Sequence, residues 1–119
     1  MKLLNFAGIM EHFEARWKEV EQELQQRFDK LPDMEGILFL IGINELGMMP
    51  KRKKFSKEQK QDLMHIAVCS LLSRRGYYEF AGNDEEGWPH YQEVKPVAAT
   101  GLQHQEALLK ECIIEYFGK

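Results

Sequence analysis

The stretch GILFLIGINELGMM, residues 36–49, is the most apolar part of the 119-residue chain. A membrane-spanning helix needs about 20 apolar residues, and this stretch is shorter and is interrupted by Asn44 and Glu45. A helix-length segment that is apolar on nearly every side must be buried on most sides. We therefore expect residues 37–46 to form an interior helix that the other elements cover.

Residues flanking and inside this stretch support a helix. Asp33, directly after Pro32, can accept hydrogen bonds from the free amides of the first turn. Gly47 stands where a left-handed residue ends a helix. Gly36 and Gly42 each cost about 1 kcal/mol relative to alanine inside a helix. A closely approaching neighbouring helix would explain why they are tolerated.

Apolar residues recur at steps of three and four over residues 4–30, which predicts a long amphipathic first helix. The stripe consists of Phe6, Met10, Phe13, Trp17, Val20, Leu24 and Phe28. Its spacing is close to that of a coiled-coil seam. Two interpretations stay open: the helix packs along its own domain, or its stripe pairs with another chain.

Two further helices are predicted by their capping signals. Ser56 with Gln59 fits a capping box, and the following segment is apolar from Leu63 until Gly76 ends it. A second capping box at Thr100 begins a last helix that runs almost to the end of the chain.

Residues 77–80 and 88–94 are aromatic and partly alternating, and the polar segment 82–87 separates them. This pattern favours two short strands and a turn, with Pro89 restricting the second strand to an edge. An aromatic loop without strand pairing is the alternative. The predicted fold is mainly α: a single domain, residues 1–119, of four helices with a short β-hairpin or aromatic loop between helices 3 and 4.

The composition is that of an ordinary soluble protein, with 44% hydrophobic and 29% charged residues. The net charge of −3 favours neither nucleic acid nor an anionic membrane. Cys69 and Cys112 lie on apolar helix faces and are expected to be reduced core residues. Glu11 and Glu14 interrupt the N-terminal region before a signal-peptide core could form. We expect a cytoplasmic protein without membrane association.

Glu45 and His65 are the candidates for chemistry, because both fall in otherwise apolar helices. A buried carboxylate must be paired or protonated, and His65 is a possible partner for Glu45. A small enzyme or metal protein that uses the pair is one hypothesis, and a solvated Glu45 is the simpler interpretation. The Asp62–His65 spacing of di-iron bundles occurs only once, and no nucleophile motif is present. The sequence thus predicts no metal site and no cofactor, and leaves catalytic residues unassigned.

A basic run of four residues precedes the third helix: Lys51, Arg52, Lys53 and Lys54. The order of three helices followed by LLSRRGYY, residues 71–78, and a hairpin resembles a winged-helix module over residues 33–94. That resemblance implies nucleic-acid binding, with the basic run as a contact. Residues 83–86 at the tip of the wing are acidic and would repel phosphate. We therefore rank a nucleic-acid partner below a protein partner.

The segment EGWPHY, residues 86–91, has the most unusual composition in the chain. Exposed, Trp88, His90 and Tyr91 would form a good anchor for a partner or small ligand. Buried, Trp88 would be a lid over the helical core. Our leading hypothesis is a non-enzymatic interaction module that self-associates through the first helix and uses this aromatic loop.

Overall fold

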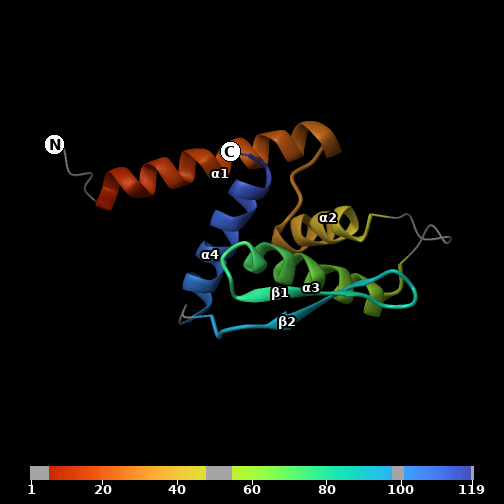
Figure 1. The fold of residues 1–119 in the computed structure, drawn as a ribbon. Coiled ribbons are helices and arrows are strands. Elements are labelled where there is room, and N and C mark those ends of the chain that lie inside the picture. Colours follow the sequence, from red (N-terminus) through yellow and green to blue (C-terminus); the bar gives the residue numbers. More distant parts are fainter. Residues whose placement is uncertain (1–5, 48–54, 98–100, 119) are drawn as a thin grey trace. The chain divides into compact units, whose positions relative to one another are not determined.

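The computed structural model describes residues 6–47, 55–97 and 101–118, and Figure 1 shows how they fold. Four helices and one two-stranded antiparallel sheet are present in this part of the chain, which confirms the predicted fold class. The elements in chain order are α1 (Phe6–Phe28), α2 (Met34–Leu46), α3 (Lys57–Ser73), β1 (Tyr78–Asn83), β2 (Pro89–Glu93) and α4 (Gly101–Tyr116).

The chain divides into two compact units. One contains α1 and α4, and the other, Asp33–Thr100, contains α2, α3 and the hairpin. The expectation of a single domain stays a prediction. Across the described ranges, no helix combines the length and the apolar character needed to cross a bilayer.

The apolar stretch of the sequence forms α2, and its side chains are the interior of the second unit. Ile37 and Ile41 are almost completely buried. Asp33 caps the helix, because its Oδ1 accepts from the Gly36 amide at 2.8 Å. Gly47 ends it in the left-handed conformation, with φ 72°, and donates its N–H to the Ile43 carbonyl. The predicted interior helix is therefore confirmed, together with both of its ends.

Gly42 of α2 lies directly against the backbone of α3. A Cβ placed on Gly42 would overlap the Leu63 carbonyl oxygen and would lie 2.7 Å from the Leu63 carbonyl carbon. A neighbouring helix therefore does approach closely at Gly42, as expected from the cost of a glycine inside a helix. Close contact at this point fixes how α2 and α3 pack.

Helix α3 begins at the predicted capping box. The Ser56 hydroxyl accepts from the Gln59 amide at 3.1 Å, and the Gln59 side chain accepts from the Ser56 amide at 2.9 Å. Its buried residues are Leu63, Ile66, Ala67, Cys69, Ser70, Leu71 and Leu72. After the helix, Gly76 adopts φ 81° and turns the chain into β1. The apolar arc that the sequence predicted for this helix is thus its buried face.

Strands β1 and β2 pair antiparallel, which decides between the predicted hairpin and an unpaired aromatic loop. The register pairs Tyr78 with Glu93 and Phe80 with Tyr91, whose rings are 5.8 Å apart. It shifts between Phe80 and Gly82, so the β1 strand carries a bulge there. Pro89 begins β2, where a missing N–H is tolerated.

Both helices of the unit of α1 and α4 carry buried apolar side chains. Val20 and Leu24 from α1 and Cys112, Ile113 and Ile114 from α4 are buried. Lys110 of α4 lies over the Trp17 ring of α1 at 5.2 Å, a cation–π contact. Both cysteines of the chain are buried free thiols, as the sequence predicted.

Candidate functional site

A pocket of ≈ 300 Å³ opens between α3 and the hairpin, within the second unit. Its volume lies at the lower end of the range of about 300–1,000 Å³ that is typical of small-molecule pockets. Nine residues line it: Gln59, Asp62, His65, Ile66, Asp84, Glu86, Trp88, Pro89 and His90. We call this site the Trp88 pocket.

Helical spacing brings the α3 residues to the Trp88 pocket. Gln59, Asp62 and Ile66 stand at i, i+3 and i+7, so they lie along one face of the helix. The capping box at Gln59 fixes the start of that face. His65 lies beside them, with its Nε2 3.6 Å from the Cys69 Sγ one turn further on. Ile66 is buried, so it supplies apolar surface, whereas Asp62 is exposed.

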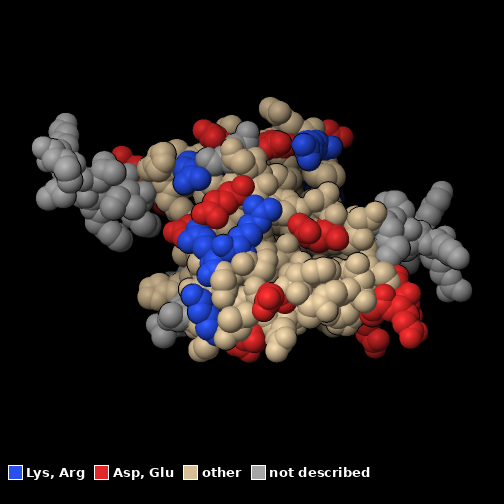
Figure 2. Space-filling view, in the orientation of Figure 1, with Lys and Arg blue, Asp and Glu red and all other residues tan. Residues whose placement is uncertain are grey.

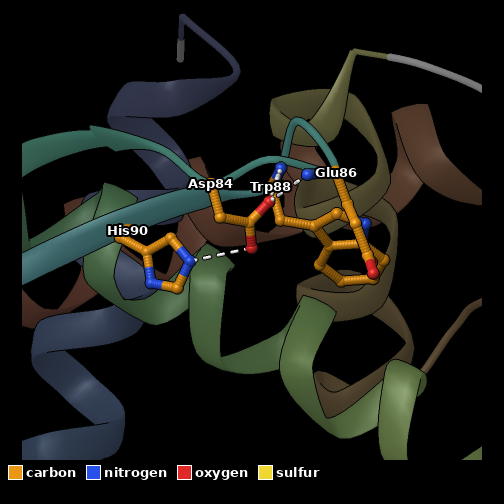
Figure 3. Close-up of polar contacts among 4 residues, drawn as sticks. All are labelled: Asp84, Glu86, Trp88 and His90. Carbon is orange, nitrogen blue, oxygen red and sulfur yellow. Dashed lines mark hydrogen bonds and ion pairs between the residues drawn. The ribbon is translucent and has the colours of Figure 1, made fainter.

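Asp84 organises the turn that carries the opposite wall. Its Oδ1 accepts from the amides of Glu86 and Trp88, each at 2.9 Å (Figure 3). Its own amide donates to the Trp88 carbonyl, and its carbonyl accepts from the Gly87 amide. Gly87 adopts φ 87°, the left-handed conformation that this hairpin turn requires near its end. The turn therefore fixes the backbone from which Glu86 and Trp88 project.

A second oxygen of Asp84 holds His90. The His90 Nε2 lies 2.9 Å from Asp84 Oδ2, as Figure 3 shows. This hydrogen bond, followed by the one from the Trp88 amide, lowers the pKa of Asp84 from its ordinary value. Asp84 is consequently ionised at neutral pH, and its charge supports the turn and orients the imidazole.

We expect the turn to loosen in acid. The pKa of Asp84 is lower in the folded than in the unfolded chain, so its stabilisation is complete above about pH 3.9. That stabilisation is lost as the pH falls through the lowered folded pKa. Amide exchange at Glu86 and Trp88, followed by NMR, would report the change. In Asp84→Asn, which accepts hydrogen bonds but cannot ionise, this pH dependence should disappear; an unchanged profile would contradict the assignment.

The Trp88 pocket combines an apolar interior with an acidic rim. Pro89 is buried, and Trp88 is half-buried with its ring extended toward α3 (Figure 3). The carboxylates of Asp62, Asp84 and Glu86 are on exposed residues. Figure 2 shows Asp and Glu side chains gathered over the tip of the hairpin. The pocket can therefore take an apolar group while keeping negative charge at its opening.

Three of the five candidate binding residues from the sequence meet at this pocket: His65 from α3, and Trp88 and His90 from the hairpin. Tyr91 is not among the lining residues and instead packs edge-on against Phe80. The Trp88 side chain is half-buried and lines the pocket together with residues of α3. The lid and the anchor therefore both stay predictions, since a half-buried ring fits either one.

Glu45 is half-buried in the last turn of α2 and does not line the pocket. No hydrogen bond joins it to His65, whose polar contact is with Cys69.

The basic run Lys51, Arg52, Lys53 and Lys54 lies outside the described residues. Within the described ranges, no group of three or more His, Cys, Asp or Glu side chains is arranged to hold a metal ion.

The sequence did not assign Gln59 and Ile66 to a site, and it treated Asp84 only as part of an acidic tip. Glu86 and Pro89 were inside the candidate segment 86–91 but were not singled out. The helical spacing of Gln59, Asp62 and Ile66 is visible in the sequence, but the same spacing is typical of any half-exposed helix face. These residues form a site only because the hairpin packs opposite them, and no short stretch of the sequence indicates how the hairpin packs on α3.

Comparisons of the chain with protein-family models, with curated proteins and with solved structures give no match.

Proposed function

We propose that the chain is a non-enzymatic cytoplasmic interaction module that binds a protein partner at the Trp88 pocket. The observation that carries this proposal is a half-buried tryptophan that lines an open pocket and stands on a turn fixed by Asp84. Tryptophan is enriched among the residues that dominate binding energy, above all where surrounding groups exclude water. A preorganised turn also reduces the entropy lost on binding.

The chemistry of the pocket supports binding rather than catalysis. The nearest thiol, Cys69, contacts His65, but burial raises the pKa of Cys69 from its ordinary value. A thiol with a raised pKa is a poor nucleophile at neutral pH, because the thiolate is the reactive form. Buried free thiols also suit the reducing environment that we propose.

The hairpin tip argues against the winged-helix alternative. Asp84, Glu85 and Glu86 are all exposed there. In a winged-helix complex the tip of the wing lies near the sugar-phosphate backbone, where three carboxylates would repel it. A protein partner faces no such penalty.

Selection of peptides from a random display library on the purified protein tests the proposed function. We expect enriched peptides whose binding is lost in Trp88→Ala and kept in Phe80→Ala, an exposed aromatic on the same hairpin that does not line the pocket. Amide NMR spectra of both variants would confirm that each is folded. Absence of enriched peptides, or peptides that bind Trp88→Ala equally well, would overturn the proposal.

Self-association through α1 is the second candidate. Phe28, at the end of the apolar stripe, is 46% exposed, and Leu31 just beyond it is 44% exposed. A second copy of the chain would cover these two exposed side chains at the end of the stripe, whereas Val20 and Leu24 within the stripe are already buried.

We expect Phe28→Glu to shift the dimer toward monomer in sedimentation equilibrium, because it places a charge in the seam. Gln25→Glu adds the same charge at an exposed position outside the stripe and should leave the association unchanged. A wild-type chain that sediments as a strict monomer would remove this candidate while leaving the Trp88 pocket untouched.

A further inference from the structure

We infer that the Trp88 pocket receives a lysine or arginine side chain of the partner. This inference builds on the proposed binding function and names the chemistry of the group that enters. It follows from three properties of the pocket: the sign of the charge at its rim, the aromatic ring in its wall and the apolar surface beneath them.

Charge at the rim is negative. Asp62 contributes a carboxylate from α3, and Glu86 contributes one from the turn on the opposite wall. Asp84 adds a third, although its Oδ2 is engaged by His90 and its Oδ1 by two backbone amides. Neither lysine nor arginine occurs among the described residues that line the pocket. A cation entering between α3 and the turn would therefore have carboxylates on two sides and no lysine or arginine beside it in the lining.

Aromatic surface favours the same ligand. The face of a tryptophan ring attracts an ammonium or guanidinium group more strongly than that of the other aromatic side chains. In Figure 3 the side chains of Glu86 and Trp88 leave the turn in the same direction, toward α3. Both line the pocket, so a cation there can meet the ring face and a carboxylate together.

Apolar surface suits the stem of the same side chain. Ile66 is 6% exposed and Pro89 is buried, and both belong to the lining. Lysine and arginine carry three or four methylene groups that pack on such surface while the charged end stays near water. A compact inorganic cation would leave this surface uncovered, and an acidic side chain would meet like charge at the rim.

Titration of the ¹⁵N-labelled protein with capped Gly-X-Gly peptides tests the inference, with X as lysine, arginine, norleucine or glutamate. The chain has two tryptophans, so the Trp88 indole signal reports the pocket and the Trp17 indole signal is an internal control. We expect the lysine and arginine peptides to shift the Trp88 signal alone. Norleucine keeps the stem without the charge and should bind about tenfold more weakly. Added salt should weaken binding of the lysine and arginine peptides but not of the norleucine peptide.

Substitutions of lining residues, compared with a control substitution on the same turn, show which side chains bind the lysine peptide. Glu86→Gln and Asp62→Asn should each weaken the lysine peptide, and Trp88→Leu should abolish its binding. Glu85→Gln removes a charge from the same turn at an exposed residue that does not line the pocket, so it should bind as the wild type does. Unchanged amide spectra away from the hairpin would show that each variant is folded.

Two results of the titration would overturn the inference. One is equal binding of the norleucine and lysine peptides, and the other is an equal loss in Glu85→Gln and Glu86→Gln. Peptides selected from the display library that depend on Trp88 but contain no basic residue would also overturn it, while the proposed function would stand. Selected peptides that are basic, and that bind Glu86→Gln weakly, would support both.

Discussion

Gly42→Ala is expected to destabilise the protein by about 2 kcal/mol, although the same change in an open helix stabilises by about 1 kcal/mol. The new Cβ would overlap the Leu63 carbonyl oxygen and lie 3.0 Å from the Leu63 Cβ. The overlapped atom belongs to the backbone of α3, so no side-chain rotation can relieve the contact. Helices α2 and α3 must move apart, and the apolar surface between them loses contacts on both sides.

Urea denaturation followed by far-UV circular dichroism would measure the change in the free energy of unfolding. Gly47→Ala is the comparison, because a Cβ there meets nothing within 4 Å and the cost, about 1 kcal/mol, comes from the left-handed φ of 72° alone. A Gly42→Ala protein as stable as the wild type, or more stable, would show that α2 and α3 are not in close contact at this point.

Leu63→Ala is expected to cost about 2–5 kcal/mol, because the side chain is 0% exposed and its removal leaves a cavity between α2 and α3. Leu31→Ala deletes the same atoms from a side chain that is 44% exposed, and it should change stability by less than about 0.5 kcal/mol. Equal effects of the two substitutions in the same denaturation experiment would contradict the burial of Leu63.

A double variant with both Gly42→Ala and Leu63→Ala tests whether the backbone or the side chain of Leu63 sets the distance between α2 and α3. Because Gly42→Ala meets the Leu63 carbonyl rather than the tip of the Leu63 side chain, Leu63→Ala should not rescue it. We expect the double variant to be no more stable than Leu63→Ala alone. A double variant more stable than either single one would mean that the side chain, not the backbone, sets the distance between the helices.

Local signals in the sequence predicted most of this fold. The caps at Asp33, Gly47 and Ser56 depend on residues three or four positions apart, so a single sequence contains the whole interaction. The hairpin turn is local in the same sense, because Asp84 and Gly87 close it within one loop. The bulge near Gly82 has no such signal, since it depends on how β1 meets β2.

The two walls of the Trp88 pocket come from segments that are far apart in the sequence. For this reason the sequence indicated only some of its residues. Trp88 and His90 stood out by composition, but their opposing wall begins at Gln59, more than 20 residues earlier. The suggested pair of Glu45 and His65 also joins residues that are far apart in the sequence, and it stays a prediction. Each stands in an apolar helix, yet only His65 faces the hairpin.

Asp84 has a structural role in addition to the negative charge that the sequence indicated. Its charge was readable as part of an acidic tip that would repel nucleic acid. The structure adds that the same carboxylate accepts two backbone amides and holds His90, so it builds the turn. The pH dependence expected for the turn follows from these hydrogen bonds, which the amino-acid composition does not reveal.

Solvent access to Trp88 tests the proposed site most directly. In NMR spectra we expect nuclear Overhauser contacts from the Trp88 ring to side chains of α3, together with partial signal loss when a soluble paramagnetic agent is added. Both results are required of a half-buried ring that forms the wall of an open pocket. A Trp88 signal as protected as a core methyl, or a ring without contacts to α3, would contradict the Trp88 pocket and the binding function proposed for it.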